Sequence, residues 1–227
     1  MRLAVLFSGG KDSTYALFKT MKGNEIVCLI SLLSENKESY MFHTPNIHLV
    51  EMQAEVLGIP LMLRETKGIK EDELKDLKKA IEKAKLKYKI QGLVTGAVAS
   101  RYQAERIQKI CDDLKIKCIN PLWMKNQVDL LNELLKDDFK AIISGVFAYP
   151  LDEKWLGREI NKDIVQQLAE LQKKYQLNPS GEGGEIETTV LDCPIFKKRI
   201  EILESEKKMI DKNSGVYIIK KAKLADK

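Results

Sequence analysis

Fold and chemistry both depend on one segment near the start of the chain, Leu3-Ala-Val-Leu-Phe-Ser-Gly-Gly-Lys-Asp-Ser13. Its apolar run, residues 3–7, has the length and composition of a buried β-strand. The glycines that follow allow a tight turn, and a helical pattern begins at Asp12 and Ser13, which are favourable N-terminal residues. A strand, a turn and a helix start in this order bind phosphate, because backbone N–H groups and the helix dipole face the anion. The residues alone leave one alternative, a tight turn with an incidental lysine at Lys11.

The composition is that of a globular protein with a sizeable core. The 227 residues suffice for one large domain or two modest ones, with 44% hydrophobic and 31% charged residues. No apolar run approaches the roughly 18 residues that a membrane span needs, and no secretion leader is recognisable. We therefore expect a cytoplasmic protein without a membrane partner.

The charge pattern does not indicate a nucleic-acid partner, although the net charge is +5. Lysines are interleaved with acidic residues, as in residues 71–79, which is typical of solvated helix faces and of heat-adapted proteins. The four cysteines are Cys28, Cys111, Cys118 and Cys193, and no two of them form a Cys-x-x-Cys pair. We expect ordinary buried thiols rather than a zinc site.

The first half of the chain alternates between apolar runs and amphipathic helical patterns. Strands are expected at residues 3–7, 25–32, 59–63, 92–96 and 116–119, and helices from 12 onward and at 47–57, 70–89 and 100–114. Asn46 and Ser100 are expected to cap their helices, and Gly58 to end one. This alternation predicts an α/β fold with a doubly wound, parallel, five-stranded sheet. Ligands of such sheets bind beyond the carboxyl ends of the strands, where residues 9–10 and Gly96 lie.

The alternation ends near Trp123, which predicts two domains, residues 1–122 and a smaller α+β domain at 123–227. In the second we expect helices at 126–136 and 163–175 and strands at 139–147, 187–191 and 216–219. Residues 151–158 are interpreted as a turn or short helix, and residues 199–209 as either strand or helix.

Carboxylates and glycines are concentrated in the segment Gly181-Glu-Gly-Gly-Glu-Ile-Glu-Thr188. If this segment leads into a strand, Glu185 and Glu187 point to the same face. Like charges gather either in open solvent or where a cation or a donor group is held, and spacing alone does not separate the two cases. His43 and His48 are too poorly spaced for a metal pair on one helix face, so we expect structural or substrate-adjacent roles.

Residues 8–13, Ser-Gly-Gly-Lys-Asp-Ser, resemble the PP-loop of the N-type ATP pyrophosphatases, which cleave ATP to AMP and pyrophosphate. Residues 178–188 are similar to the second signature of one branch of that superfamily, the diphthine–ammonia ligases of diphthamide synthesis. Further blocks that look like this family are residues 41–46, 100–106, 121–123, 155–158 and 192–198. The resemblance thus covers nearly the whole chain, and Cys193, where we expect Gly or Ala, is a mild departure that we do not interpret as a nucleophile.

The resemblance implies the HUP or PP-loop fold, also described as adenine nucleotide alpha hydrolase-like, and a ligase that forms a C–N bond. Diphthine is a modified histidine of translation elongation factor 2 that carries a free carboxylate. ATP adenylates the carboxylate and releases pyrophosphate, and ammonia then displaces AMP to give the amide, diphthamide. ATP and Mg²⁺ are the implied cofactors, and elongation factor 2 and ammonium the implied partners, while a homodimer is left open.

The same resemblance implies the site residues. Residues 1–122 become the nucleotide-binding domain and residues 123–227 the substrate-binding domain. The phosphates are expected on Ser8, Gly9, Gly10, Lys11, Asp12 and Ser13, with Asp12 also holding Mg²⁺. Catalytic roles are expected for Lys11, Asp12 and Glu185. Substrate contacts are expected from Tyr102, Gln103, Arg106, Glu182, Gly183, Gly184, Glu185 and Glu187, with the acidic glycine segment facing the phosphates.

Three alternatives remain at this point. A PP-loop enzyme acting on another carboxylate is one, and an enzyme acting on tRNA is the second. The latter is disfavoured because no catalytic cysteine pair and no dense basic run is visible. The third is a non-catalytic protein, either a nucleotide sensor or a structural interaction module.

Overall fold

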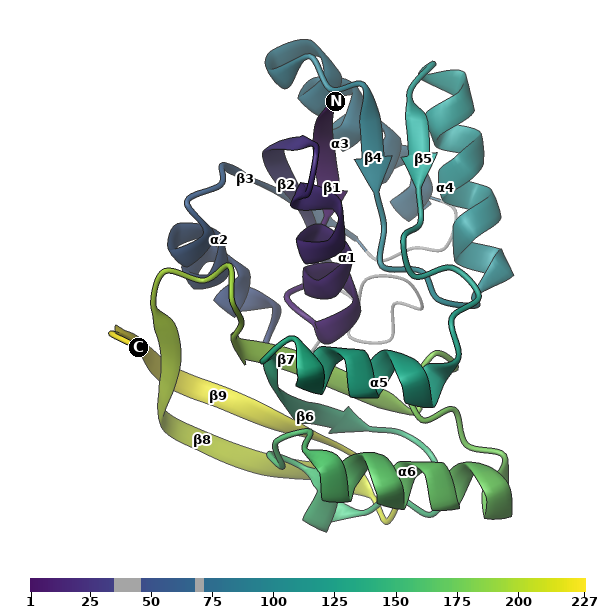
Figure 1. Ribbon diagram of the computed structural model, residues 1–227, viewed down its shortest axis with the longest axis vertical. Coiled ribbons are helices and arrows are strands. Elements are labelled where there is room, and N and C mark those ends of the chain that lie inside the picture. The colour runs from purple at the N-terminus through teal and green to yellow at the C-terminus, as the bar shows by residue number, and fades with distance from the viewer. Residues whose placement is uncertain (35–45, 68–71) are drawn as a thin grey trace. The chain divides into compact units, whose positions relative to one another are not determined.

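The computed structural model describes residues 1–34, 46–67 and 72–227 (Figure 1). Its chain forms two compact units, one made of Met1–Ser8 and Asp12–Trp123, the other of Gly9–Lys11 and Met124–Lys227. His43 and most of the family-like block 41–46 lie outside the described residues. Among the described helices we find none with the length and apolar character needed to span a bilayer.

The first unit is built on a parallel five-stranded sheet, as predicted, in the order β3-β2-β1-β4-β5. Its strands are β1 (Arg2–Leu6), β2 (Glu25–Ser34), β3 (Leu61–Thr66), β4 (Gly92–Val94) and β5 (Lys117–Ile119). β3 begins two residues later than expected, after Pro60, which has no N–H to donate to a sheet ladder. The strand order reverses at β1, so the carboxyl end of β1, where residues 8–10 follow, is the topological switch point.

The helices of this unit are α1 (Lys11–Met21), α2 (Val50–Leu57), α3 (Asp72–Tyr88) and α4 (Arg101–Asp113), with a 3-10 turn η1 (Ile47–Leu49) before α2. Ser100 caps α4 as predicted, since its Oγ accepts from Gln103 N at 3.4 Å. Gly58 ends α2 in the left-handed conformation, with φ of 66°. The prediction that the Asn46 side chain caps a helix was wrong, because this side chain makes no capping hydrogen bond. The turn that follows Asn46 is a 3-10 turn rather than an α-helix.

The core of this unit joins the sheet to α3 and α4. Leu77, Ile81 and Ala84 of α3 pack with Leu93 of β4 and Ile107 of α4 in one buried cluster. In Figure 1, α1 lies in front of β1, on the face opposite α3. The chain after β4 approaches the start of α1 closely: a Cβ atom added at Gly96 would lie 2.7 Å from Ser13 N and 2.8 Å from the Asp12 carbonyl carbon. Only glycine therefore fits at position 96 without a shift of the α1 backbone.

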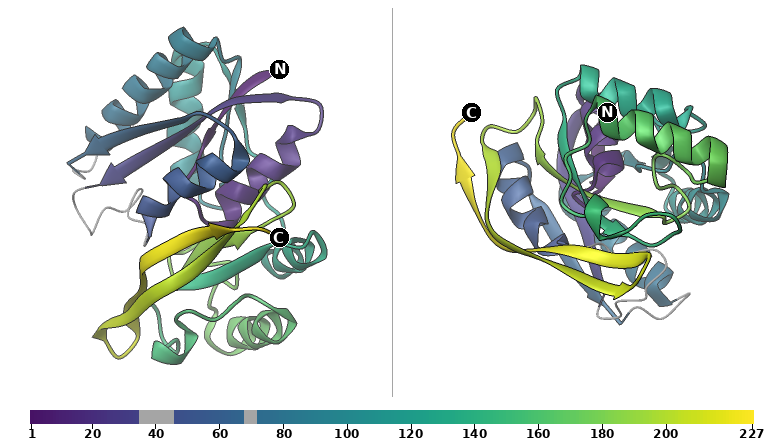
Figure 2. Two further views of the ribbon diagram at one scale, coloured as in Figure 1. Left: turned by 90° about the vertical axis from the view of Figure 1, so that its left-hand side faces the viewer. Right: turned by 90° about the horizontal axis from the view of Figure 1, so that it is seen from below.

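The second unit contains an antiparallel four-stranded sheet in the order β7-β6-β9-β8. The strands are β6 (Lys140–Val146), β7 (Ile186–Asp192), β8 (Arg199–Asp211) and β9 (Ser214–Ala225), and the helices are α5 (Gln127–Lys136), the 3-10 turn η2 (Glu153–Trp155) and α6 (Lys162–Tyr175). Figure 2 shows α5 and α6 side by side along one face of this sheet. Residues 199–209, for which the sequence allowed either a strand or a helix, form the strand β8.

The short strand expected at 216–219 was wrong in length, because β9 has 12 residues. β9 pairs with β8 over its whole course, from Arg199↔Ala225 at one end to Asp211↔Ser214 at the other. Lys220, Lys221 and Lys223 interrupt the apolar alternation on which the expectation rested. Pairing along its whole length with β8, the preceding strand of the same hairpin, keeps these lysines in the sheet.

Replacing Leu93 by alanine should lower the free energy of unfolding of the first unit by about 2–5 kcal/mol, because its side chain is fully buried and the change leaves a cavity. The matched control is Leu86→Ala on α3, whose side chain is 83% exposed and whose loss should cost under about 0.5 kcal/mol. Urea denaturation of both variants measures the difference. Equal losses would contradict the central position of β4 in the core.

Candidate active site

The ends of the phosphate-loop motif, residues 8–13, are hydrogen-bonded to each other in the first unit. Ser8 N donates to Ser13 Oγ at 3.2 Å, and the two hydroxyl oxygens lie 3.1 Å apart. Between them Gly9 has a φ of 76°, which an L-residue adopts only with strain. The motif therefore forms a closed turn at the start of α1, at the end of β1 where the strand order reverses.

The middle of the motif, Gly9–Lys11, belongs to the second unit and is hydrogen-bonded to β7. Val190 N donates to Gly9 O at 3.0 Å, and Lys11 N donates to Thr188 Oγ1 at 3.1 Å. The Lys11 N–H, one of the helix-start donors expected to face phosphate, is thus already bonded to a side chain. These bonds fix the backbone of the loop from β7.

Lys11 carries a charge in a buried position, with a side chain that is 2% exposed. Burying an ammonium group is costly unless acceptors surround it. Its Nζ donates to the carbonyl oxygen of Ser180, in the segment that leads into the acidic glycine sequence. The structure thus brings Lys11 and the second sequence signature within hydrogen-bonding distance.

Glu185 shapes the acidic glycine segment from inside. Its Oε1 accepts from Asn178 N at 3.2 Å and Asn178 Nδ2 at 2.6 Å, and its Oε2 accepts from Gly183 N at 2.9 Å. Glu185 precedes β7, which begins at Ile186, so it does not share a strand face with Glu187 as expected. Its carboxylate instead turns back into the loop.

Two glycines let this loop close. Gly181 and Gly184 have φ of 73° and 85°, and a Cβ atom added at Gly181 would overlap the carbonyl oxygen of Ile186. Gly184 N donates to Gly181 O at 2.9 Å, and Gly181 N donates to Asn178 O at 2.8 Å. The loop is therefore held by its own backbone as well as by Glu185.

Gln127, the first residue of α5, fastens the loop from outside. Its Nε2 donates to Asn178 Oδ1 at 2.9 Å, and its Oε1 accepts from Ser180 N at 3.0 Å and Ser180 Oγ at 2.8 Å. Together these bonds form a hydrogen-bond chain from Lys11 through Ser180, Gln127 and Asn178 to Glu185.

Sequence reasoning missed several residues that hold this site together. Asn178, Ser180 and Thr188 stand inside the family-like block 178–188, but only its glycines and glutamates received roles. Nothing in the sequence marked Gln127 as a site residue except its place after Asn126. Asn126 caps α5, because its Oδ1 accepts from Val128 N and Asp129 N.

Tyr102, Gln103 and Arg106 lie on the first turns of α4, in the first unit. The guanidinium carbon of Arg106 stands 3.5 Å from the centroid of the Tyr102 ring, and its Nη1 donates to Tyr102 O at 3.4 Å. Stacking of this kind orders the arginine fork and leaves it positively charged.

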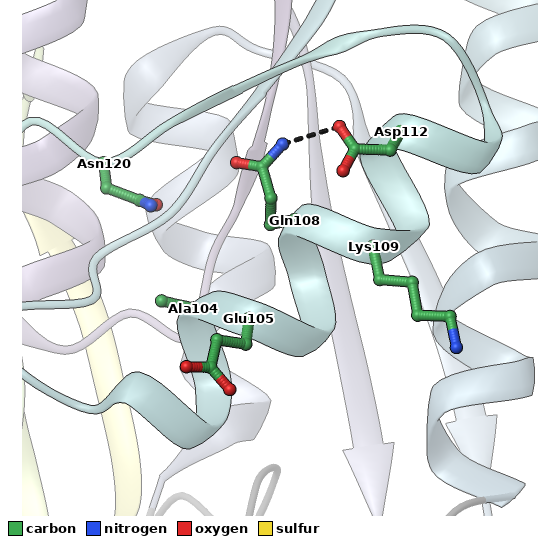
Figure 3. A pocket seen from close by; sticks show the side chains of 6 residues that line it. All are labelled: Ala104, Glu105, Gln108, Lys109, Asp112 and Asn120. Carbon is green, nitrogen blue, oxygen red and sulfur yellow. Dashed lines mark hydrogen bonds between the residues drawn. The ribbon is translucent and has the colours of Figure 1, made fainter.

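A shallow pocket of about 370 Å³ lies along the same helix (Figure 3). It is lined by Ala104, Glu105, Gln108, Lys109, Asp112 and Asn120. None of the expected substrate residues lines it. Within the pocket, Gln108 Nε2 donates a hydrogen bond to Asp112 Oδ1 at 2.7 Å. The pocket therefore gives no support to the α4 assignments.

Metal ligands are sparse in the part of the chain that the structure describes. No group of three or more His, Cys, Asp or Glu side chains there could hold a metal ion, and His48 stands on the 3-10 turn η1. Mg²⁺ commonly binds through one or two carboxylates and the oxygens of its phosphate ligand, so it does not require such a group. Asp12, half-buried at the start of α1, is the carboxylate of the phosphate loop.

Cys28 and Cys193 are buried thiols rather than nucleophiles. All four are free thiols, and Cys193 is 1% exposed. Burial raises the pKa of Cys193 to about 12, and burial also raises the pKa of Cys28 to about 12. These two thiols stay protonated at neutral pH, in agreement with the structural interpretation of Cys193.

Comparison with known proteins identifies the same family over both halves of the chain. Residues 1–118 match the diphthamide synthase N-terminal domain, and residues 126–225 match the diphthamide synthase C-terminal domain. The diphthine–ammonia ligase of Mus musculus is 38% identical over 226 residues, covering 91% of this chain and 84% of that protein. The Danio rerio enzyme of that name is 34% identical over 91% of this chain and 88% of its own. The Schizosaccharomyces pombe enzyme is 34% identical over 100% of this chain and 40% of its own length. The chain belongs to the diphthamide synthase family.

Proposed function

We propose that this chain is an ATP-dependent diphthine–ammonia ligase that converts diphthine on translation elongation factor 2 to diphthamide. The observation that carries this proposal is the match of both family domains, over residues 1–118 and 126–225, together with relatives named for that activity. We place the reaction in the cytoplasm, where elongation factor 2 works.

The reaction proceeds in two balanced steps. An oxygen of the diphthine carboxylate attacks the α-phosphorus of ATP, the bond to the β-phosphate breaks, and pyrophosphate leaves. The nitrogen of ammonia then attacks the acyl carbon, AMP leaves with the bridging oxygen, and nitrogen loses a proton to give the amide. Activation is needed because an unactivated carboxylate has no adequate leaving group.

In this proposal residues 1–122 bind the nucleotide, and residues 8–13 receive its phosphates. The N-terminal end of α1 favours negative charge, and Lys11 presents an ammonium group whose position the Ser180 carbonyl fixes. Lys11 and Asp12 act as catalytic residues by stabilising and orienting the pyrophosphate as it departs. Asp12 would hold Mg²⁺, which neutralises phosphate charge when bound.

Residues 123–227 bind the acceptor in this proposal. Glu185 acts as a positioning residue, because all three donors that reach its carboxylate come from the loop itself. Glu182, Glu187 and the exposed Gly183 and Gly184 present the loop to the acceptor and to ammonium. Tyr102, Gln103 and Arg106 are proposed to contact nucleotide or acceptor from α4.

The activity is tested by incubating the protein with ATP, ammonium and elongation factor 2 purified with its diphthine unamidated. We expect mass spectrometry to show conversion of the carboxylate to the amide, with AMP and pyrophosphate formed in equal amounts. Omission of ammonium is the control and should stop amide formation. ATP cleavage without any amidation of diphthine would point to another acceptor.

Lys11→Ala should lower the rate of pyrophosphate release by about 10²–10³-fold, because a buried, fixed ammonium group is lost where negative charge develops. Lys22→Ala, which removes an exposed lysine just after α1, should leave the rate unchanged. Circular dichroism checks that both variants fold. Wild-type pyrophosphate release by Lys11→Ala would remove this lysine from the chemistry.

Glu185→Ala should keep ATP binding and lose amide formation by about 10²-fold, because the loop loses the group that shapes it. Asn178→Ala removes the main partner of the same carboxylate and should cost nearly as much. In a double-mutant cycle the losses should not add, since both changes break one contact. A loss far larger for Glu185→Ala than for Asn178→Ala, with additive effects, would show a chemical role for the carboxylate.

A further inference from the structure

Two tyrosines of the second unit meet at a right angle on the surface. Tyr149 follows β6, and Tyr175 is the last residue of α6. Their ring centroids are 5.3 Å apart with an interplanar angle of 86°, and Tyr149 is 63% exposed. This pair is called the aromatic corner below.

The aromatic corner already attracts a cation. The ammonium of Lys174 lies 5.1 Å from the centroid of the Tyr175 ring. A hydrogen bond from this ammonium lowers the pKa of Tyr175, and a second contribution comes from the Tyr149 hydroxyl. Aromatic faces carry negative quadrupole charge, and in this edge-to-face pair the ring faces that are not covered by the partner ring attract a cation.

The chain anchors the aromatic corner beside the acidic glycine segment. Phe147 N, two residues before Tyr149, donates to Glu185 O at 2.9 Å. Tyr175 is followed by Gln176 in the left-handed conformation and then, after Leu177, by Asn178, which binds the Glu185 carboxylate. Each tyrosine therefore lies two or three residues along the chain from a residue that is hydrogen-bonded to Glu185.

We propose that Tyr149 and Tyr175 bind the quaternary ammonium group of the acceptor side chain, an inference that rests on the proposed function. Diphthine carries a trimethylammonium group. This group has no N–H, so it cannot donate a hydrogen bond and attracts an acceptor only through its positive charge. Aromatic faces recognise such a group by cation–π attraction and by contact with its methyl groups. The carboxylate of Glu185 is less suited to this role, because loop donors already occupy it.

In this arrangement Lys174 is a resident cation that the acceptor displaces. Its side chain is exposed and belongs to the last turn of α6, so it can swing away at little cost. Its neighbour Lys173 is exposed on the same turn, whereas the recorded cation–π contact with Tyr175 is that of Lys174. The two lysines form a matched pair in charge and in location.

The test uses NMR titration of the full-length protein with choline and with 3,3-dimethylbutan-1-ol, the uncharged carbon isostere of choline. We expect choline to bind at least about threefold more tightly than the isostere. Tyr149→Leu and Tyr175→Leu should each weaken choline binding about threefold to tenfold, whereas Tyr149→Phe should retain it. Lys174→Ala should strengthen choline binding, Lys173→Ala should not, and adding Tyr175→Leu to Lys174→Ala should abolish the gain. Equal binding of the two probes, or wild-type choline binding by Tyr149→Leu, would overturn the proposal.

An amidation assay separates this proposal from the proposed function. Tyr149→Leu should raise KM for diphthine-bearing elongation factor 2 about threefold to tenfold and leave kcat nearly unchanged. An unchanged KM in an otherwise active enzyme overturns the aromatic corner alone. Selective choline binding by a wild-type protein that amidates nothing supports the receptor and overturns diphthine as its ligand.

Discussion

The hydrogen-bond chain from Lys11 to Glu185 is the constraint on which the rest of the site depends. A buried ammonium group needs a fixed acceptor, and the Ser180 carbonyl supplies one. Ser180 is held by Gln127, Gln127 holds Asn178, and Asn178 holds Glu185. Buried polar chains are favourable only when each member is satisfied, so the position of Lys11 depends on residues far along the sequence.

Hydrogen bonds to β7 explain why the middle of the phosphate loop, Gly9–Lys11, belongs to the second compact unit. Residues 8 and 12–13 stay with the parallel sheet, whereas Gly9 and Lys11 are bonded to β7 through Val190 and Thr188. A turn with two glycines has little shape of its own, since glycine gains no rigidity from a side chain. The hydrogen-bonded pair Ser8 and Ser13 thus closes the ends of the loop, and the bonds to β7 fix the backbone of Gly9 and Lys11.

Prediction from sequence succeeded where structure is local. The parallel sheet followed from alternating strands and helices, with Ser100 and Gly58 marking helix ends by their own chemistry. It failed in part for β9 although its partner β8 is its neighbour in a hairpin, because Lys220 and Lys221 interrupt the apolar alternation that marks a strand. The two glycine-rich signatures were visible as local motifs, in which Gly9, Gly181 and Gly184 adopt positive φ angles. Gln127 was invisible, since its partners at 178 and 180 become its neighbours only in the folded chain.

The placement of charge suggests how one site can treat two unlike ligands. Lys11 is buried and fixed, which suits an anion whose charge develops at one point. The trimethylammonium group of the acceptor is a diffuse cation that cannot donate a hydrogen bond. A fixed carboxylate would bind this group no better than it binds ammonium. The loop instead uses the carboxylate of Glu185 to keep its own shape and leaves the polarisable faces of Tyr149 and Tyr175 near its ends. If the two tyrosines bind the trimethylammonium group as proposed, binding of the acceptor does not require the Glu185 carboxylate to give up its loop donors.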